Sequence, residues 1–357
     1  MRFDIHQRLA MAETPAGAAY CDADVYEEEV QKIFARQWLS VPEPPNDPGA
    51  VRPFHLLAGA LDESLVLTRD MNGATHCLSN VCTHRGMLVA CEEGSAKRLR
   101  CGYHGRRFGL DGSLEAAPGF EGAECFPRAA DDLPSVPLRQ WGPLHFTSVD
   151  PARSFGSWME PLEPWLGFLD VDDLVPDPVA TLRFEVEANW KLYLDNYLEG
   201  FHIPTVHKTL AAALDVGGYR SECLVGGSVQ IGMASEGTPI LNVGSNHPLA
   251  GQNVAALYFH LFPNTLINVY PWGVSLNQVN PMGVSKTEVI FERYVSHPEL
   301  LEQGAGSGLH RVEMEDEAVV EATQVGVRSR LYKRGRYAPR HESAVHHFHR
   351  WWAQQLG

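Results

Sequence analysis

The chain of 357 residues lacks the features expected of a membrane-spanning, secreted or nucleic-acid-binding protein. It has no run of about 18 apolar residues, so no segment is expected to cross a membrane. The residues from Met1 to His6 lack the apolar core of a signal peptide. Positive charge is scarce, with 29 Lys and Arg against 44 Asp and Glu, and the net charge of −15 disfavours contact with phosphate backbones. We therefore expect a cytoplasmic protein without membrane or nucleic-acid partners.

Cysteine is sparse and odd in number, with seven residues. Disulfides are disfavoured in a reducing compartment, so cysteines that are paired with histidines indicate metal binding. The chain also lacks a flavin or nicotinamide fingerprint. A redox enzyme with this sequence would need a separate source of electrons.

The distribution of short apolar runs predicts two domains, and the fold class is α+β. Residues 40–152 contain short β-like runs separated by turn signals such as Met71-Asn72-Gly73, which predicts a small all-β domain. Residues 1–39 and 153–357 combine strands with flanking helices but show no βαβ alternation, which predicts an antiparallel sheet with helices. The small domain is thus inserted in, or precedes, the larger one.

Three helices and one connector are expected in the larger domain. The apolar periodicity predicts helices over residues 22–38, 190–201 and 309–331. The segment 160–178 is rich in Pro and Asp and is expected to be a connector.

Two Cys/His pairs in the small domain predict a metal centre. Cys82 and His84 are followed, after 16 residues, by Cys101 and His104. Two thiolates and two imidazoles suit either zinc or a [2Fe–2S] cluster with two cysteines on one iron and two histidines on the other. Zinc fingers usually separate the cysteine pair from the histidine pair, whereas here each loop supplies one of each. The spacing therefore favours the cluster.

A second metal site is predicted in the segment 189–207. On a continuous helix Asp195, Glu199 and His202 would lie within about 60° of one another. Unpaired carboxylates are costly to bury, and a metal would explain such a polar stripe. A bend at Pro204 could bring His207 toward His202.

The late helix offers a carboxylate to complete a two-histidine, one-carboxylate iron site. Asp316 is expected on the buried face, with Glu315 as the next candidate. That face is predicted to contain Val312, Asp316, Val319, Val320, Thr323 and Val327. The opposite, solvated face is predicted to contain Glu313, Glu317, Glu321 and Gln324.

Together these motifs resemble the alpha subunits of Rieske non-haem iron oxygenases of the ring-hydroxylating type, over nearly the whole chain. The resemblance rests on C-x-H-x16-C-x2-H and on N-W-K-x4-N-x2-E-x2-H-x4-H, which begins at Asn189. It implies one [2Fe–2S] cluster on Cys82, His84, Cys101 and His104, and one Fe(II) on His202, His207 and Asp316. It also implies catalytic roles for Glu199 and Asp195.

The resemblance implies a terminal oxygenase component that uses O2 to hydroxylate or demethylate a small organic substrate. Electrons would come from NAD(P)H through a separate reductase or ferredoxin. The family forms head-to-tail trimers in which one subunit's cluster serves its neighbour's iron, so a homotrimer or a multiple of it is expected. Glu199 would then bridge His202 to His104 of the neighbouring subunit.

Among relatives, the chain looks most like choline, carnitine and betaine monooxygenases. A quaternary ammonium substrate could be held by an aromatic cage, although aromatic residues in strands are more often core. The candidate cage residues are Tyr193, Tyr258, Tyr270 and Trp272. An aromatic-ring hydroxylating mono- or dioxygenase is the alternative. A Rieske electron carrier without oxygenase activity and a scaffold without iron are alternatives from other classes.

One residue departs from the family pattern. Arg106 stands where the family usually has Trp, and it adds to a basic cluster on and between the two Cys/His loops. These residues could form a docking patch for an acidic reductase or ferredoxin, or could simply be solvated or paired. The cluster comprises Arg85, Lys97, Arg98, Arg100, Arg106 and Arg107.

Overall fold

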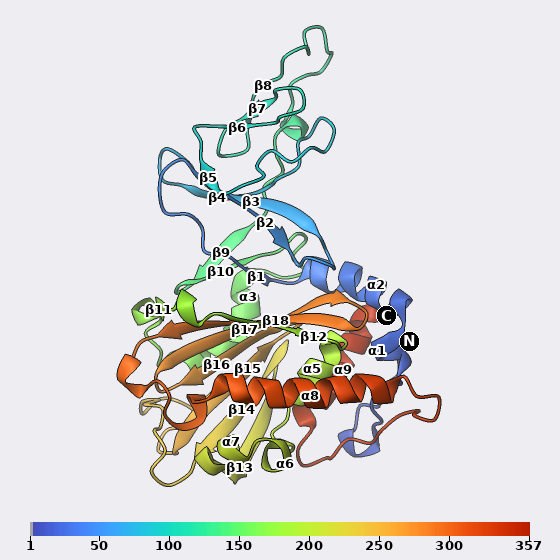
Figure 1. The fold of residues 1–357 in the computed structure, drawn as a ribbon, viewed down its shortest axis with the longest axis vertical. Helices are drawn as coiled ribbons and strands as arrows, with labels where there is room; N and C mark the ends of the chain where they lie inside the picture. The colour runs from blue at the N-terminus through green and yellow to red at the C-terminus, as the bar shows by residue number, and fades with distance from the viewer. Residues whose placement is uncertain (1–2) are drawn as a thin grey trace. The chain divides into compact units, whose positions relative to one another are not determined.

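The computed structural model describes residues 3–357, which form two compact units. Unit 1 comprises Met1–Gln37 and Ala152–Gly357, and unit 2 comprises Trp38–Pro151 (Figure 1). Of the helices formed by the described residues, none combines the length and the apolar character needed to cross a membrane.

Unit 2 contains only short antiparallel strands and one 3-10 turn. Four strands form a sheet in the order β4-β3-β2-β5, three form β6-β7-β8, and three form β1-β10-β9. The strands are β1 Leu39–Val41, β2 Ala50–Leu56, β3 Glu63–Arg69, β4 Thr75–Ser79, β5 Gly94–Ser95, β6 Leu99–Arg100, β7 Arg107–Phe108, β8 Leu114–Ala116, β9 Leu138–Trp141 and β10 Leu144–Thr147. Buried residues of these strands form a small core around Val66, Leu78 and Phe108, and this core includes Cys82 and Cys101.

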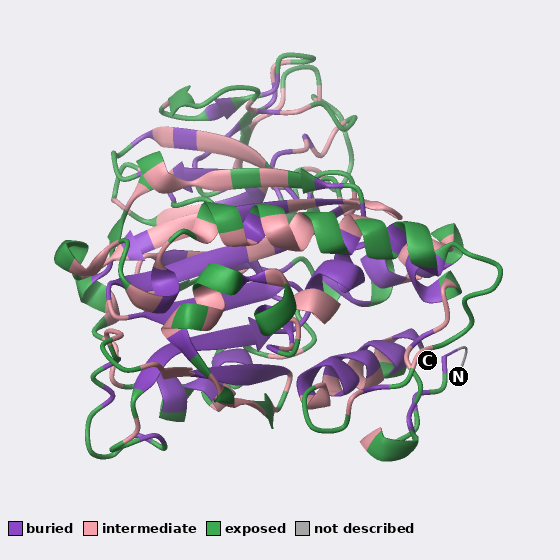
Figure 2. Ribbon diagram, turned by 60° about the horizontal axis from the view of Figure 1, so that its bottom comes forward, coloured by how far each residue is buried: buried purple, intermediate pink, exposed green. Residues whose placement is uncertain are grey.

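Unit 1 is built on one large antiparallel sheet in the order β11-β18-β17-β16-β15-β14-β13, with β12 paired to β18. The strands are β11 Val175–Pro176, β12 Leu182–Val186, β13 Leu214–Leu224, β14 Gly227–Ala234, β15 Val254–Leu261, β16 Thr265–Tyr270, β17 Gly273–Gly283 and β18 Lys286–Val295. Every residue of β15 and β16 is buried, so both faces of the central sheet are covered (Figure 2). The α+β class expected from the sequence is confirmed.

Helices cover the sheet of unit 1. They are α1 Ala18–Cys21, α2 Ala23–Lys32, α3 Phe155–Met159, α4 Glu163–Leu166, α5 Trp190–Tyr197, α6 Ile203–Val206, α7 Lys208–Ala213, α8 Leu309–Val327 and α9 Ser343–Leu356. Figure 1 shows α8 lying across one face of the sheet, where it contacts α5. The predicted connector at 160–178 instead contains α4 and short 3-10 turns, because Trp165 and Leu166 are buried.

A buried ion pair joins α2, α5 and α9. The Lys191 ammonium donates to the Glu29 carboxylate at 2.5 Å, and both side chains are fully buried. The indole N–H groups of Trp190 and Trp352 also donate to Glu29, at 2.9 and 2.6 Å. Burial lowers the pKa of Lys191, and the Glu29 charge opposes this shift. Three donors thus satisfy one buried carboxylate and position the start of α5.

Candidate metal centres and active site

The segment that carries the two predicted histidine ligands is a short helix followed by a tight turn. Helix α5 begins after Asn189, whose side chain caps the amide of Lys191, and it ends at Tyr197. The predicted continuation to Phe201 is wrong. The Glu199 carboxylate accepts the amides of Phe201 and His202, which draws the chain out of the helix.

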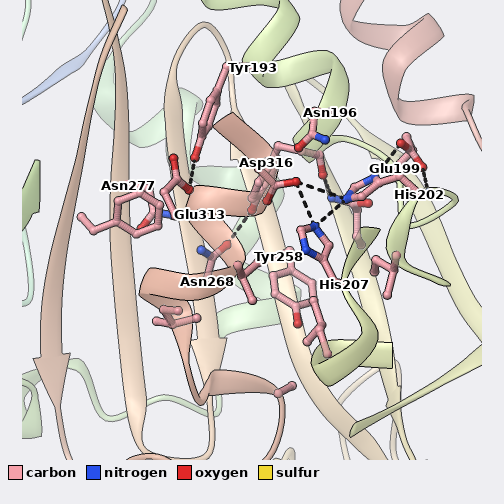
Figure 3. A pocket seen from close by; sticks show the side chains of 18 of the residues that line it. Tyr193, Asn196, Glu199, His202, His207, Tyr258, Asn268, Asn277, Glu313 and Asp316 are labelled. Carbon is pink, nitrogen blue, oxygen red and sulfur yellow. Dashed lines mark hydrogen bonds and ion pairs between the residues drawn. The ribbon is translucent and has the colours of Figure 1, made fainter. Parts of the chain in front are cut away.

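His202, His207 and Asp316 converge on one point. One ligand atom from each lies within 4.8 Å of the other two. The Nε2 atoms of the two histidines are 3.2 Å apart, and Asp316 Oδ1 lies 2.9 Å from His207 Nε2 and 3.5 Å from His202 Nε2 (Figure 3). Two imidazole nitrogens and a carboxylate oxygen that face a common centre fit a mononuclear iron of the facial-triad type.

Carboxylates hold the opposite side of each imidazole. Glu199 Oε1 lies 2.7 Å from His202 Nδ1, and Glu315 Oε2 lies 2.8 Å from His207 Nδ1. Each Nδ1–H can donate to its carboxylate, which leaves Nε2 free to bind metal, as is usual for histidine ligands. Glu315, the second candidate for the carboxylate ligand, thus contacts the far side of His207 rather than the common centre.

The charges around His207 suit a cation. Burial is the largest influence on this imidazole and acts to lower its pKa. The Asp316 and Glu315 carboxylates outweigh burial, so the pKa of His207 is raised. A site that stabilises a proton between two carboxylates would stabilise a divalent cation at the same place.

The predicted division of α8 into a buried and a solvated face is partly wrong. Glu313 and Gln324, expected in solvent, are 3% and 0% exposed, whereas Val319 is exposed. Each side chain has one polar atom with a buried partner: the Tyr193 hydroxyl donates to Glu313 Oε2 at 2.7 Å, and Gln324 Oε1 accepts the amide of Asn189 at 2.7 Å. Helical periodicity locates an apolar stripe but cannot anticipate polar partners that come from another helix.

A cavity of about 100 Å³ lies beside the three converging residues. Five tyrosines and one phenylalanine line it, and the rings of Tyr219, Tyr258 and Tyr270 form one group with centroid distances of 6.4 and 5.9 Å. Of the proposed cage residues, Tyr193, Tyr258 and Tyr270 line the cavity. Trp272 does not line it but stacks on Tyr270 at 5.0 Å.

Several cavity residues were not predicted from the sequence. They are Tyr197, Tyr219, Gln230, Asn268, Asn277, Phe291 and Glu313, among others. Two signals could have found part of this set. Asn268 lies two residues before Tyr270 on β16 and so shares its face, and Glu313 lies three residues before Asp316 on α8.

Asp195 is not part of the cavity lining. It accepts the Tyr20 hydroxyl at 2.9 Å and lies 2.8 Å from His349 Nε2. The Tyr337 hydroxyl in turn lies 2.7 Å from His349 Nδ1. Asp195 thus faces α1 and α9. Glu199 and His202 do not share its helical face, because α5 ends at Tyr197 and both residues lie in the turn that follows.

Two loops of unit 2 hold the predicted cluster ligands with the same backbone design. The amide of Gly86 donates to the carbonyl of Cys82 at 3.0 Å, and the amide of Gly105 donates to that of Cys101 at 3.1 Å. Each glycine lies four residues after its cysteine and has a positive φ, +71° and +74°. L side chains rarely adopt this conformation, so the glycines allow the same turn to form twice.

The thiols of this site lie inside and the imidazoles lie nearer the surface. Cys82 and Cys101 are each 2% exposed, whereas His84 is half-buried and His104 is exposed. The two imidazole centroids are 4.7 Å apart. Burial, and after it the neighbouring Cys101 thiol, raise the pKa of Cys82 against the opposing effect of a backbone hydrogen bond. Two buried thiols with two outward imidazoles fit a cluster whose irons have different ligands.

The prediction that Arg106 belongs to an exposed basic patch is wrong. Its side chain is 3% exposed and lies over the Phe120 ring, 4.4 Å from the centroid. It donates to Thr83 Oγ1 at 3.1 Å, and Asp131 lies 3.9 Å away. Arg106 therefore ties the second cysteine loop to the first. The other five basic residues of the cluster are exposed.

Comparison with known proteins agrees with this geometry. Residues 172–357 match the ring hydroxylating alpha subunit (catalytic domain) family, and residues 54–127 match the Rieske [2Fe-2S] domain family. The chain is 32% identical to the choline monooxygenase, chloroplastic, of Arabidopsis thaliana, over 97% of this chain and 84% of the relative. It is 28% identical to the carnitine monooxygenase oxygenase subunit of Escherichia coli (strain K12), over 88% of this chain and 84% of that one.

A solved structure has the same fold. It is that of a quaternary ammonium Rieske monooxygenase, described with carnitine oxidation and inter-subunit electron transfer, and it matches with a TM-score of 0.74. The identity is 24%, over 97% of this chain and 95% of that chain. The two matched families imply a Rieske [2Fe–2S] cluster and a mononuclear iron in this chain. On these grounds the chain belongs to the Rieske non-haem iron oxygenases, as a ring-hydroxylating-type alpha subunit with its catalytic domain.

Proposed function

We propose that this chain is the terminal component of a monooxygenase that hydroxylates or demethylates a small quaternary ammonium or related cationic substrate. The observation that carries the proposal is the convergence of His202, His207 and Asp316 beside a cavity walled by tyrosines. These three residues would hold the iron. Cys82, His84, Cys101 and His104 would hold the cluster.

The chain's own residues prepare the cavity for such a reaction. When bound, the iron supplies O2 activation with electrons that reach it through the cluster. The tyrosine group formed by Tyr219, Tyr258 and Tyr270 offers ring faces to a cation and keeps water out. Tyr219 donates to Gln230 at 3.1 Å and Tyr197 donates to Asn268 at 2.6 Å, so the polar groups of the wall are held in place.

The names of the relatives favour the same substrate class. One relative is a choline monooxygenase and another is a carnitine monooxygenase subunit. Both names denote trimethylammonium substrates, and both proteins align with most of this chain.

Glu199 is proposed to link the two metal sites between subunits of a homotrimer. Its carboxylate contacts the imidazole of His202, which would bind the iron. The imidazole of His104 is exposed and could be reached from another chain. In the assembly, Glu199 would accept a hydrogen bond from His104 of the neighbouring subunit and so connect the cluster to the iron.

Asp195 is proposed to act as a positioning residue. Its contacts with Tyr20 and His349 hold the helix that ends just before Glu199. It would influence the reaction through the position of that turn.

A separate NAD(P)H-dependent reductase, directly or through a ferredoxin, is the proposed electron donor, and a cytoplasmic location stays our expectation. The exposed basic residues Arg85, Lys97 and Arg107 lie on or between the loops that would hold the cluster. Complementary charge there would speed docking of an acidic donor.

Turnover with a reductase tests the proposal. The loaded enzyme should consume O2 and NADH in the presence of choline or a related cation, and ¹⁸O from O2 should appear in the product. Simple aromatic substrates provide the comparison. Turnover of aromatics alone would contradict the proposed substrate class.

A further inference from the structure

The lining of the cavity beside the iron site is rich in carboxylates. None of the described residues that line it is lysine or arginine. Three of them are acidic, namely Glu199, Glu313 and Asp316. Glu199 is engaged by His202 and Asp316 by His207, so Glu313 is the carboxylate outside the proposed iron site.

Glu313 has one engaged oxygen and one without a partner. Oε2 accepts the Tyr193 hydroxyl at 2.7 Å (Figure 3). Oε1 is buried and has no hydrogen-bond partner among residues 3–357. The residue is 3% exposed. The Tyr258 hydroxyl, on the same cavity wall, is also buried without a partner.

An unpaired buried carboxylate oxygen is costly unless a ligand satisfies it. Burial raises the pKa of Glu313 well above its usual range, and the charges of Asp316 and Glu317 raise it further, against the opposing hydrogen bond from Tyr193. A cation in the cavity would stabilise the ionised form. A ligand that carries its own carboxylate would instead place a second negative charge near Glu313, and no lysine or arginine of the described lining would balance that charge.

We infer that Glu313, held by Tyr193, selects the substrate by charge: the cavity accepts a cation whose other end is neutral or a hydrogen-bond donor, and it rejects a cation that also carries a carboxylate. The inference rests on the proposed function and deepens it. It favours amino alcohols of the choline type over carboxylated substrates such as carnitine or glycine betaine. Glu313 is thus a specificity residue distinct from the iron ligands.

Three probes separate charge from shape. Choline is the cation, 3,3-dimethylbutan-1-ol is its neutral isostere, and glycine betaine carries the additional carboxylate. Affinities for the loaded holoenzyme are measured by calorimetry, and O2-dependent turnover is measured with the reductase. The wild type is compared with Glu313→Gln, and Glu321→Gln serves as the matched control, because Glu321 lies on the same helix outside the cavity lining.

A close pair of opposite charges in a water-poor site changes affinity by at least about tenfold. Glu313→Gln should therefore reduce the preference for choline over the neutral isostere by at least about tenfold and improve binding of glycine betaine relative to choline. Glu321→Gln should leave both ratios unchanged. Glu313→Asp, which restores the charge, should restore the preference, and iron content and the cluster spectrum verify folding in each variant.

An unchanged choline-to-isostere ratio in Glu313→Gln would overturn the inference, as would a wild type that binds glycine betaine as tightly as choline. Loss of charge preference in the Glu321→Gln control would overturn it too. The proposed function fails separately, if the wild type shows the binding preferences but turns over none of the cations. The two failures therefore give different results.

Discussion

The two metal sites of this chain are held by different kinds of structure. The four proposed cluster ligands lie within residues 82–104, on two loops with the same turn. The three proposed iron ligands come from a turn after α5 and from α8, more than 100 residues later. Local turns position the cluster ligands, whereas the iron ligands depend on how α5 and α8 pack. The cluster site should therefore tolerate changes in distant packing better than the iron site does.

Their surroundings differ as well. At the cluster site the imidazoles of His84 and His104 face outward, as suits a group that exchanges electrons with a partner. At the iron site His207 is 1% exposed, and both histidines are oriented by carboxylates of the same chain. The cluster site is therefore accessible to a partner protein, whereas the iron site is enclosed.

The largest effect is expected from removal of the Asp316 carboxylate, which should abolish iron binding without changing the cluster. Asp316→Ala removes the carboxylate at the common centre, so the enzyme should lose about one iron per chain and all turnover while the cluster spectrum is unchanged. Glu315→Ala is the neighbouring control. It should keep iron but bind it roughly 10–100-fold more weakly, because it removes only the support of His207. Loss of one iron in Glu315→Ala, with iron retained in Asp316→Ala, would show that Glu315 is the ligand.

Glu199→Gln tests the proposed link between the sites. Both metals should remain, since Glu199 is not a ligand, but electron transfer from the reduced cluster should slow by at least about tenfold. Stopped-flow oxidation of the cluster in the presence of substrate and O2 measures this rate. A variant with wild-type rates, or a fully active monomer, would contradict the link.

Disruption of the buried ion pair between Glu29 and Lys191 tests how far the iron site depends on distant packing. Glu29→Gln leaves the Lys191 ammonium buried without a charged partner and should lower the free energy of unfolding of unit 1 by about 3–5 kcal/mol. Glu28→Gln, one residue earlier on α2, disrupts an exposed pair with Lys32 and should cost about 0.5 kcal/mol or less. Thermal unfolding with iron release as a second signal measures both. Equal losses of stability in Glu29→Gln and Glu28→Gln would contradict the claim that the buried ion pair supports the packing of unit 1.

The smallest effect concerns access to the cluster. Lys97→Glu with Arg98→Glu should slow reductase-driven turnover several-fold at low salt and flatten its salt dependence, because charge mainly alters the rate of association. Single turnover with a chemically reduced cluster should be unaffected. Reversal of the exposed Arg330 and Lys333 in unit 1 provides a control of equal charge. Equal losses in both assays would indicate damage to folding or assembly.

The sequence anticipated the features that depend on spacing along the chain. Local patterns predict the Cys/His motif, the His202–His207 pair and the Asp316 carboxylate, and the structure brings His202, His207 and Asp316 together. Features that depend on partners from elsewhere were missed. Gln324 is buried because it accepts the amide of Asn189, and Arg106 is buried because Phe120 and Thr83 surround it. The cavity residues Tyr219, Tyr258 and Tyr270 come from the separate strands β13, β15 and β16, whose register no local pattern specifies.

Iron and sulfide analysis of the purified chain and of two variants tests the central claim, that one chain holds two independent metal sites, most directly. The wild type should contain about three iron atoms and two acid-labile sulfides per chain. Cys82→Ser should retain about one iron and lose the Rieske-type EPR signal, and Asp316→Ala should retain about two irons with that signal intact. A wild type with only two irons, or a Cys82→Ser variant that keeps the Rieske signal, would contradict the account.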